Sequence, residues 1–392
     1  MISKQQTPQI RLTGFSEDWV QKKLVDEVIF FSGLTYTPSD VVDKLGTLVL
    51  RSSNVQKGAI TLGDNVYVNS EVVNSQNVEV GDIIVVVRNG SRNLIGKHAM
   101  ITKPMTNTVI GAFMTGIRAP VPSFFNTLLD TQEFDDEVSK NLGATINQIT
   151  GGMFKSMSFY LPESNEQTAI GNLFQNIDQT ISLQRRKHEQ TQTLKKSLLG
   201  KMFPKKGQVQ PEIRLTGFSG DWTEVKLGEI SDTTIGEFVI KSKQSPNGAY
   251  PVYNGGISYT GLYDDFNNEA NKIVISARGA NAGFVNIVRR KYWAGNSCYS
   301  VSIDTKEISI DFLYYFIKEN QYLFTNFQQA ANIPSVSKGD VEKFNIVLPN
   351  SREEQTAIGQ LFKKLDDTIS LQAKQLKTLE NLKKALLAKM FV

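Results

Sequence analysis

One unit of sequence occurs twice in this chain, and this duplication limits the possible folds more than any other feature. The segment Ile10–Trp19 (IRLTGFSEDW) recurs as Ile213–Trp222 (IRLTGFSGDW), with nine of ten residues identical. A second pair of segments, Glu166–Phe203 and Glu354–Phe391, matches at 22 of 38 positions. Between these blocks we find no comparable identity. Each half of the chain therefore has a shared opening segment, a divergent middle segment and a shared closing segment.

The duplication predicts two domains that alternate with two long helices. The middle segments cover about residues 20–160 and 223–349. With the opening segments included, the predicted parts are a first domain over residues 1–160, a first helix over 161–204, a second domain over 205–349 and a second helix over 350–392.

The closing segments have the apolar periodicity of long helices. Apolar residues alternate in steps of four and three, which is the seam pattern of a coiled coil. The predicted seam residues are Ile170, Phe174, Ile177, Ile181, Ile358, Phe362, Leu365, Ile369, Leu376 and Leu379. Capping boxes are predicted at Ser164/Gln167 and Ser351/Glu354, and Pro204 ends the first helix. Helices this long and one-sided need a partner helix.

The order of the parts predicts how the two helices pair. The first helix leads, through a short linker at residues 204–212, to the second domain, and the second helix leaves that domain. An antiparallel pair with pseudo-two-fold symmetry places the domains at opposite ends without a strained connection. The first seam has polar positions at Gln184, His188 and Thr191.

The middle segments predict domains of the mixed α/β (α+β) class. Residues 80–87 (VGDIIVVV) and 272–277 (KIVISA) are typical of buried strands bounded by turn residues. Residues 311–321 are predicted to form a short helix that is rich in aromatic residues.

Composition excludes several classes of protein. The single cysteine, Cys298, cannot form an intrachain disulfide. The chain has no run of 18 apolar residues and no apolar signal core at its start, so we expect a cytoplasmic protein without a membrane span. The net charge of +4 is weak evidence for any partner.

Motifs for catalysis or metal binding are not found in the sequence. The stretch from Gly90 to Gly96-Lys97-His98 fails the spacing of a phosphate-binding loop. There is no dinucleotide fingerprint, no amino-methyltransferase motif, no zinc-protease motif and no cysteine cluster. Asp221, Glu224 and Lys226 have a spacing that acidic and basic residues often reach by chance. We therefore expect no catalytic residue and no metal site in this chain.

One pattern is common to both middle segments: a buried strand that ends in arginine, followed by a loop of small residues and a glycine. It occurs at Arg88 and again at Arg278. Arginine and asparagine can bind guanine and adenine edges bidentately, and glycine lets the backbone approach a ligand. A β-hairpin with a solvated turn fits the same pattern. The candidate DNA-binding residues are Arg51, Asn54, Arg88, Asn89, Ser91, Arg92, Lys97, Lys241, Lys243, Asn254, Tyr259, Arg278, Asn281, Arg290 and Asn296.

The organisation resembles the specificity subunit of type I restriction–modification enzymes over essentially the whole chain. The resemblance rests on the duplicated GFS-x-DW motif, the block LP-x-S-x-EQ-x-AI and the ending Lys-x-x-Leu-Leu-x-x-Met-Phe. In that family each divergent middle segment is a target recognition domain that reads one half of a bipartite site in double-stranded DNA. The paired helices set the spacer and dock two modification (methyltransferase) subunits, through which the restriction (translocase/nuclease) subunits join.

The resemblance also implies that this chain is a non-catalytic subunit without a cofactor of its own. S-adenosylmethionine, ATP and magnesium are expected on the partner subunits. Two other functions fit the sequence: a stand-alone DNA-binding regulator with duplicated reading domains, and a coiled-coil adaptor with no DNA role. Tight, specific DNA binding by the purified chain alone would favour the first, and indifference to mutation of the arginine loops would favour the second.

Overall fold

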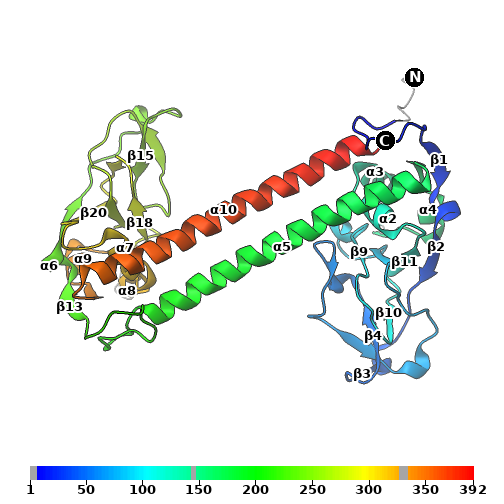
Figure 1. The fold of residues 1–392 in the computed structure, drawn as a ribbon, viewed down its shortest axis with the longest axis horizontal. Coiled ribbons are helices and arrows are strands. Elements are labelled where there is room, and N and C mark those ends of the chain that lie inside the picture. The colour runs from blue at the N-terminus through cyan, green and yellow to red at the C-terminus, as the bar shows by residue number, and fades with distance from the viewer. Residues whose placement is uncertain (1–6, 143–146, 326–333) are drawn as a thin grey trace. The chain divides into compact units, whose positions relative to one another are not determined.

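The computed structural model describes residues 7–142, 147–325 and 334–392, which form two compact units. Unit 1 contains residues up to Arg185 together with Gln375–Val392, and unit 2 contains Arg186–Lys374. Both long helices are present as predicted: α5 spans Ser164–Met202 and α10 spans Arg352–Met390 (Figure 1). Each unit thus contains one part of each long helix.

Unit 1 is a mixed α/β domain, as predicted. Its strands are β1 (Val20–Lys23), β2 (Ile29–Ser32), β3 (Val41–Val42), β4 (Thr47–Leu50), β5 (Val55–Gln56), β6 (Ala59–Ile60), β7 (Val66–Val68), β8 (Ile83–Val86), β9 (His98–Met100), β10 (Thr108–Ile110), β11 (Met114–Arg118) and β12 (Ser158–Leu161). Its shorter helices are α1 (Leu24–Glu27), α2 (Pro122–Leu128), α3 (Gln132–Asn141) and α4 (Gly151–Ser156), with 3-10 turns η1 (Pro38–Asp40), η2 (Ser52–Asn54), η3 (Ser70–Val72) and η4 (Arg92–Leu94).

Unit 2 is built from the same kinds of element. Its strands are β13 (Thr223–Lys226), β14 (Ser231–Ile235), β15 (Tyr250–Tyr253), β16 (Gly261–Tyr263), β17 (Lys272–Ser276), β18 (Val285–Val288), β19 (Trp293–Ala294), β20 (Cys298–Ile303) and β21 (Asn345–Leu348). Its shorter helices are α6 (Leu227–Ile230), α7 (Ile310–Glu319), α8 (Tyr322–Thr325) and α9 (Lys338–Glu342), with the 3-10 turn η5 (Lys241–Lys243).

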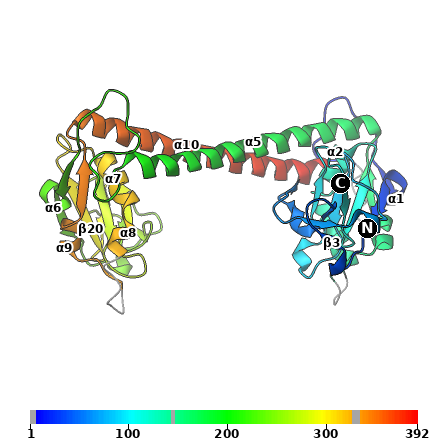
Figure 2. The same ribbon diagram turned by 90° about the horizontal axis from the view of Figure 1, so that it is seen from below.

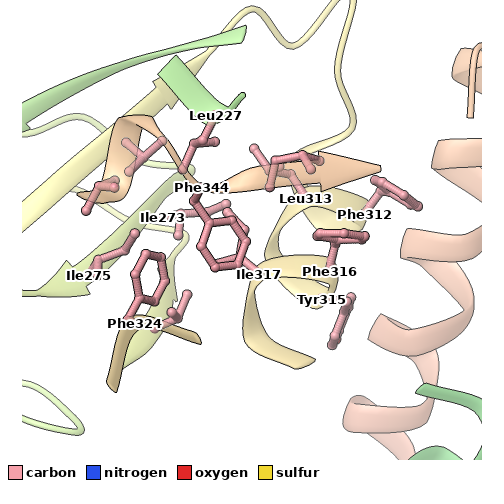
Figure 3. Close-up of a cluster of buried hydrophobic side chains, with 14 of the residues drawn as sticks. Leu227, Ile273, Ile275, Phe312, Leu313, Tyr315, Phe316, Ile317, Phe324 and Phe344 are labelled. Carbon is pink, nitrogen blue, oxygen red and sulfur yellow. The ribbon is translucent and has the colours of Figure 1, made fainter. Parts of the chain in front are cut away.

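The main sheets of the two middle segments have the same strand order although their sequences differ. Unit 1 contains the antiparallel sheet β2-β11-β8-β9, and unit 2 contains the antiparallel sheet β14-β20-β17-β18 in the corresponding order. A second sheet holds one parallel pair in each unit, β4 with β10 and β15 with β19. Strand β8, and β17 from its second residue on, are buried, as their unbroken apolar sequences predict. In unit 2 the core lies between β17 and α7 (Figure 3).

Within each unit, α5 and α10 run antiparallel, as predicted (Figure 2). In unit 1, Asp178 of α5 pairs with Lys383 of α10 at 2.7 Å, and Gln184 bonds to Gln375 at 2.8 Å. In unit 2, Lys195 pairs with Asp366. Residue numbers therefore rise along one helix as they fall along the other. The pairs Asp178–Lys383 and Asp366–Lys195 are equivalent by the repeat, since the corresponding residues are 188 positions apart.

The predicted seam residues are buried most deeply where each long helix joins the core of a unit. Ile170 and Phe174 are buried in the core of unit 1, where Phe174 contacts the ring of Phe391 with centroids 6.1 Å apart. Ile358 and Phe362 occupy the equivalent places in unit 2. Ile181 is also buried, and the remaining predicted seam residues are half-buried; they are Ile177, Leu365, Ile369, Leu376 and Leu379.

Each long helix has a glycine, at equivalent positions of the repeat, where a shorter helix of the same unit packs closely against it. A Cβ atom at Gly171 would lie 2.7 Å from the backbone nitrogen of Phe124 at the start of α2. A Cβ atom at Gly359 would lie 2.7 Å from the backbone nitrogen of Phe312 at the start of α7. Distances this short exclude a side chain, so the repeated glycine is explained by packing.

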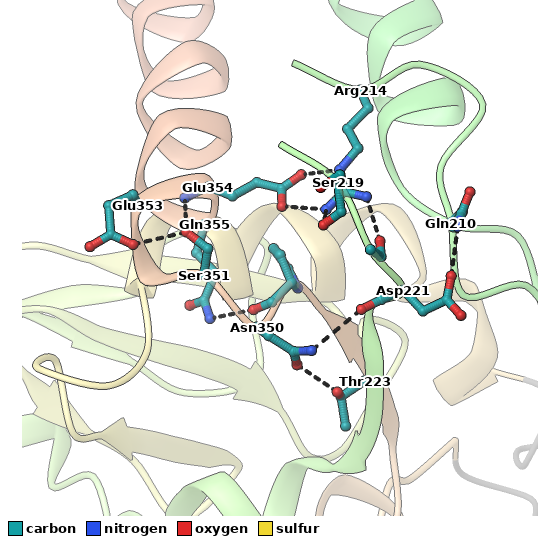
Figure 4. Close-up of polar contacts among 12 residues, drawn as sticks. Gln210, Arg214, Ser219, Asp221, Thr223, Asn350, Ser351, Glu353, Glu354 and Gln355 are labelled. Atoms are coloured by element: carbon teal, nitrogen blue, oxygen red, sulfur yellow. Dashed lines mark hydrogen bonds and ion pairs between the residues drawn. The ribbon is translucent and has the colours of Figure 1, made fainter. Parts of the chain in front are cut away.

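The repeated opening segments bind the long helices through an arginine that we did not single out from the sequence. Arg11 donates two hydrogen bonds to the carboxylate of Glu166, both 2.7 Å long. Arg214 binds Glu354 in the same bidentate way (Figure 4). The hydrogen bond to the carboxylate raises the pKa of each arginine. The pair therefore fixes each opening segment to the first turn of its helix.

This contact corrects the predicted capping boxes. Glu354 donates its backbone N–H to Ser351 Oγ at 3.2 Å, but its carboxylate binds Arg214 instead of returning to the cap (Figure 4). At the first helix Ser164 lies inside the helix, and Gln167 donates to the Pro162 carbonyl at 2.9 Å. A carboxylate at the third position of a helix can bind either the backbone of the cap residue or an arginine far away in sequence. The spacing of the residues does not show which of these contacts forms.

Candidate nucleic-acid interface

Three loops of unit 1 are joined by hydrogen bonds at one edge of its sheets. We call residues 51–54, 88–97 and 111–114 loop cluster 1. Asn89 donates to the Ser52 hydroxyl at 3.0 Å, and the Val87 N–H donates to the Phe113 carbonyl at 3.0 Å. The Gly111 N–H donates to the Leu50 carbonyl at 2.8 Å. Segments far apart in sequence thus form one surface.

Unit 2 repeats this arrangement in loop cluster 2, which we define as residues 254–260, 278–284 and 295–297. The Ala277 N–H donates to the Ser297 carbonyl at 2.7 Å, and the Gly295 N–H donates to the Tyr253 carbonyl, also at 2.7 Å. The first bond is equivalent to the Val87–Phe113 bond of unit 1, and the second is equivalent to the Gly111–Leu50 bond.

The two arginines of the shared sequence pattern occupy equivalent structural positions. Arg88 follows β8 and forms a β-bridge with Gln148, while Arg278 follows β17 and forms a β-bridge with Ser335. The loops end at Gly96 and Gly283, whose φ angles are +85° and +84°, values that favour glycine. The two loops therefore begin and end at equivalent positions, although the first is longer and contains η4.

In unit 1 most of the predicted residues lie in loop cluster 1. Ser91, Arg92 and Lys97 are exposed there. Arg51 is half-buried and pairs with Asp64 at 2.8 Å. Within the described ranges, no ion pair involves Arg88, Arg92 or Lys97. The cluster therefore presents three cations without an acidic partner.

The prediction for Asn54 is wrong, because this residue is fully buried. Its side chain accepts a hydrogen bond from the Arg51 backbone and donates to the carbonyls of Thr61 and Asp64. Asn54 thus builds the turn that carries Arg51. Asn89 is also engaged within the loops, since its side-chain oxygen accepts from the Ser91 N–H at 3.0 Å.

In unit 2 the predicted residues are more dispersed. Asn254 accepts from the Ser297 N–H at 3.1 Å, and Asn281 donates to the Gly255 carbonyl at 3.5 Å, so both support loop cluster 2. Asn296 is half-buried in the turn between β19 and β20, and Tyr259 is exposed. Arg278 is exposed and has no ion pair among the residues described.

Three predicted cations of unit 2 lie outside loop cluster 2. Lys241 and Lys243 are exposed on η5. The segment that follows them is close to the cluster, since a Cβ atom at Gly261 would lie 2.7 Å from the Gln244 amide. Arg290 follows β18 at the opposite end of the β17–β18 hairpin from Arg278, because Lys272 pairs with Val288 there. The structure therefore does not bring Arg290 together with Arg278.

Exposed apolar side chains at these edges were missed by the sequence analysis. Phe113 in loop cluster 1 is 51% exposed, and Ile257 in loop cluster 2 is 58% exposed. Phe238, next to the residue that bridges Gly295, is 71% exposed. In the sequence nothing distinguishes Phe113 and Phe238 from buried members of the neighbouring apolar runs. Only the strand pairing reveals that they lie at a hairpin or loop.

The cysteine of the chain supports loop cluster 2. Burial raises the pKa of Cys298 to about 11, and its sulfur accepts the Gly255 N–H at 3.0 Å, so the thiol supports the loop as a neutral group. The described residues contain no group of three or more His, Cys, Asp or Glu side chains arranged to hold a metal ion. Across the same residues, no helix is long and apolar enough to cross a membrane.

The sequence matches the family described as type I restriction modification DNA specificity domain over residues 17–193 and 219–381. A putative type I specificity subunit of Mycoplasma pneumoniae is 29% identical over 157 residues, which are 40% of this chain and 41% of that protein. This match thus spans less than half the length of that relative. A putative type I restriction enzyme specificity subunit of Methanocaldococcus jannaschii is 23% identical over 95% of this chain and 92% of its own length.

A solved structure has the same fold over nearly its whole length. It is the specificity subunit of a type I restriction–modification system from M. genitalium. It aligns with a TM-score of 0.71 at 18% identity and covers 98% of this chain and 99% of that one.

Proposed function

The chain belongs to the type I restriction modification DNA specificity family, and we propose that it is the subunit that reads the DNA sequence in such a system. Each unit would read one half of a bipartite site in double-stranded DNA. The observation that carries this proposal is the repetition of one loop arrangement in two domains of different sequence. Each copy presents an exposed arginine, Arg88 or Arg278, after a buried central strand and without an acidic partner among the described residues.

The division of labour within each cluster follows from general chemistry. Phosphate contacts supply most of the affinity for DNA, while contacts with base edges supply specificity. Arg88 and Arg278 leave rigid strand ends, so their position relative to the DNA is set by the fold. Arg92, Lys97, Lys241 and Lys243 are exposed on turns and suit phosphate contacts. Different loop residues on the same scaffold would give the two units different half-sites.

The arginine variants test this proposal. Arg88→Ala is expected to relax base choice in one half-site, and Arg278→Ala in the other, at a cost of about 1–3 kcal/mol for each lost base contact. The measurement is methylome sequencing of cells that carry the chain with its partner subunits. Lys306→Ala is a control, since Lys306 is exposed between β20 and α7 and belongs to neither loop cluster. Equal losses on specific and random DNA would assign the arginines to phosphates.

We further propose that the long helices dock two copies of one modification subunit. Four leucines on α5 and α10 are exposed, between 48% and 56%, although apolar residues on a paired helix usually face the core. Leu183 and Leu371 are equivalent by the repeat, as are Leu194 and Leu382. Unit 1 contains Leu183 and Leu382, and unit 2 contains the other two. Two equivalent apolar surfaces fit two copies of the same partner.

Stoichiometry tests the docking proposal. Light scattering on the co-purified complex should give one chain with two modification subunits. The double variant Leu183→Glu/Leu382→Glu should lose one of the two copies, because it alters only one of the equivalent surfaces. Leu45→Glu is the control, since Leu45 is 99% exposed and lies on neither long helix. A stable complex of one chain with one partner at saturation would refute the proposal.

The same helices would set the spacer between the two half-sites. Seven residues preserve the periodicity of a helix pair, so one heptad inserted into both α5 and α10 leaves the contacts on either side in register. We expect such a variant to methylate the same half-sites at a new spacing. Continued methylation at the original spacing by a folded variant would exclude this role.

We propose that catalysis and its cofactors belong to the partners. S-adenosylmethionine, ATP and magnesium would bind the modification and restriction subunits, and this chain would only recognise the DNA sequence. In assays of the purified chain, DNA methylation should therefore require added modification subunit.

A further inference from the structure

Phe113 places an exposed aromatic ring beside the arginine of loop cluster 1. The ring is 51% exposed, and the guanidinium carbon of Arg88 lies over it at 5.0 Å from the centroid. Arg88 has no ion pair with any residue that the structure describes. The ring is therefore the side-chain partner that the structure provides for this guanidinium. A contact of this kind stabilises an exposed cation through the negative charge of the ring face.

The backbones that carry the two side chains are fixed to each other. The N–H groups of Val87 and Arg88 both donate to the Phe113 carbonyl, at 3.0 and 3.2 Å. The Asn89 N–H donates to the Asn147 carbonyl at 3.3 Å on the other side of the loop. These backbone hydrogen bonds thus set the position of the Phe113 ring relative to Arg88.

We propose that Phe113 is a positioning residue that holds the Arg88 guanidinium for a guanine in the half-site read by unit 1. This inference rests on the proposed function. A guanidinium lying over a ring keeps its N–H donors free at its edge, and guanine offers two acceptors, O6 and N7, that match them. A free arginine side chain loses much rotamer entropy when it binds, and the ring reduces this loss by limiting its freedom before DNA arrives.

Unit 2 provides an internal comparison. The residue equivalent to Phe113 is Ser297, whose carbonyl accepts the Ala277 N–H at 2.7 Å. The backbone arrangement is therefore the same, but the ring is replaced by a hydroxymethyl group. Positioning of this kind is then a property of unit 1 alone, and Phe113 variants should leave the half-site of unit 2 unchanged.

The experiment uses the full chain in complex with its modification subunits. Once methylome sequencing has given the site, methylation rates are measured on duplexes in which each base pair of both half-sites is replaced in turn. Arg88→Ala should relax one guanine position of one half-site. Phe113→Leu should relax the same position about two- to fivefold, and Phe113→Trp should restore wild-type discrimination because it keeps an aromatic face. Leu45→Ala and Ser297→Ala, as controls, should leave this position unchanged.

Two outcomes would overturn the inference. One is unchanged discrimination by Phe113→Leu at the position that Arg88→Ala relaxes. The other is an equal loss by Phe113→Leu at every position, which would indicate only a structural role for the hairpin. Amide exchange in β8 establishes that each variant is folded. Failure of the proposed function can be distinguished from failure of this inference, because in that case the wild-type complex would methylate no bipartite site at all.

Discussion

Replacing Arg11 with alanine is expected to destabilise unit 1 by about 3–5 kcal/mol, because it leaves the Glu166 carboxylate buried without its partner. The Glu166 side chain is 2% exposed, and both of its oxygens accept hydrogen bonds of 2.7 Å from Arg11. Arg11 also donates to the Glu17 carbonyl at 2.5 Å, so the opening segment loses its anchor as well. Arg214→Ala should have the same effect in unit 2, where Glu354 is 1% exposed.

Hydrogen exchange read by mass spectrometry separates the two units. In Arg11→Ala, peptides from β8 should exchange faster while peptides from β17 keep their wild-type protection, and Arg214→Ala should reverse the pattern. Lys140→Ala is the matched control, since it breaks an ion pair with Glu137 in which the lysine side chain is 66% exposed, a kind of pair that contributes about 0–1 kcal/mol. Equal losses of protection in both units after either change would show that the pairs do not stabilise their units separately.

Sequence reasoning was most successful where one local signal determined the structure. The 22 matches between the closing segments identified two helices, and the short linker between the first helix and the second domain favoured an antiparallel pair. Contacts such as Gln184 with Gln375 confirm this direction. The buried strand before Arg88 was also identified, because a run of β-branched residues between turns strongly favours a strand with both faces covered.

The positions of individual polar side chains could not be predicted in the same way. Asn54 and Arg51 are close in sequence and were assigned the same role, yet Asn54 is buried under the turn and Arg51 pairs with Asp64. The difference depends on how β4 pairs with its neighbours, which the sequence pattern does not encode. Arg290 and Arg278 were both predicted to contact DNA, whereas the antiparallel pairing of β17 and β18 places them at opposite ends of a hairpin.

The repeat also contained a signal for the long-range ion pairs between arginine and glutamate. Arg11 and Arg214 recur within nearly identical segments, and Glu166 and Glu354 recur at equivalent positions of the closing segments. In each half of the chain a shared opening segment and a shared closing segment flank a divergent middle segment. A contact between the opening and closing segments would explain why both are shared. Joint recurrence of an arginine and a buried carboxylate was the signal available for this contact.

Replacing Phe391 with alanine is expected to destabilise unit 1 by about 3–5 kcal/mol, although the residue is the last but one of the chain. Its ring is 5% exposed and contacts Trp19, Phe124 and Phe174 at centroid distances of 5.9, 5.8 and 6.1 Å. These rings come from the opening segment, α2 and α5, so Phe391 joins three elements of the core. Removing it leaves a cavity that such rigid neighbours cannot fill.

Phe203 is the equivalent residue by the repeat and supplies the matched control. It contacts Phe312, Phe316 and Phe362 at 5.5 to 5.6 Å, all within unit 2. Phe203→Ala should therefore increase exchange in β17, and Phe391→Ala should increase exchange in β8. The conservative Phe391→Leu should recover most of the stability because it fills most of the same volume. If Phe391→Ala left β8 fully protected, the residue that follows α10 would not stabilise the core of unit 1, and the two copies of the repeat would differ in how they are stabilised.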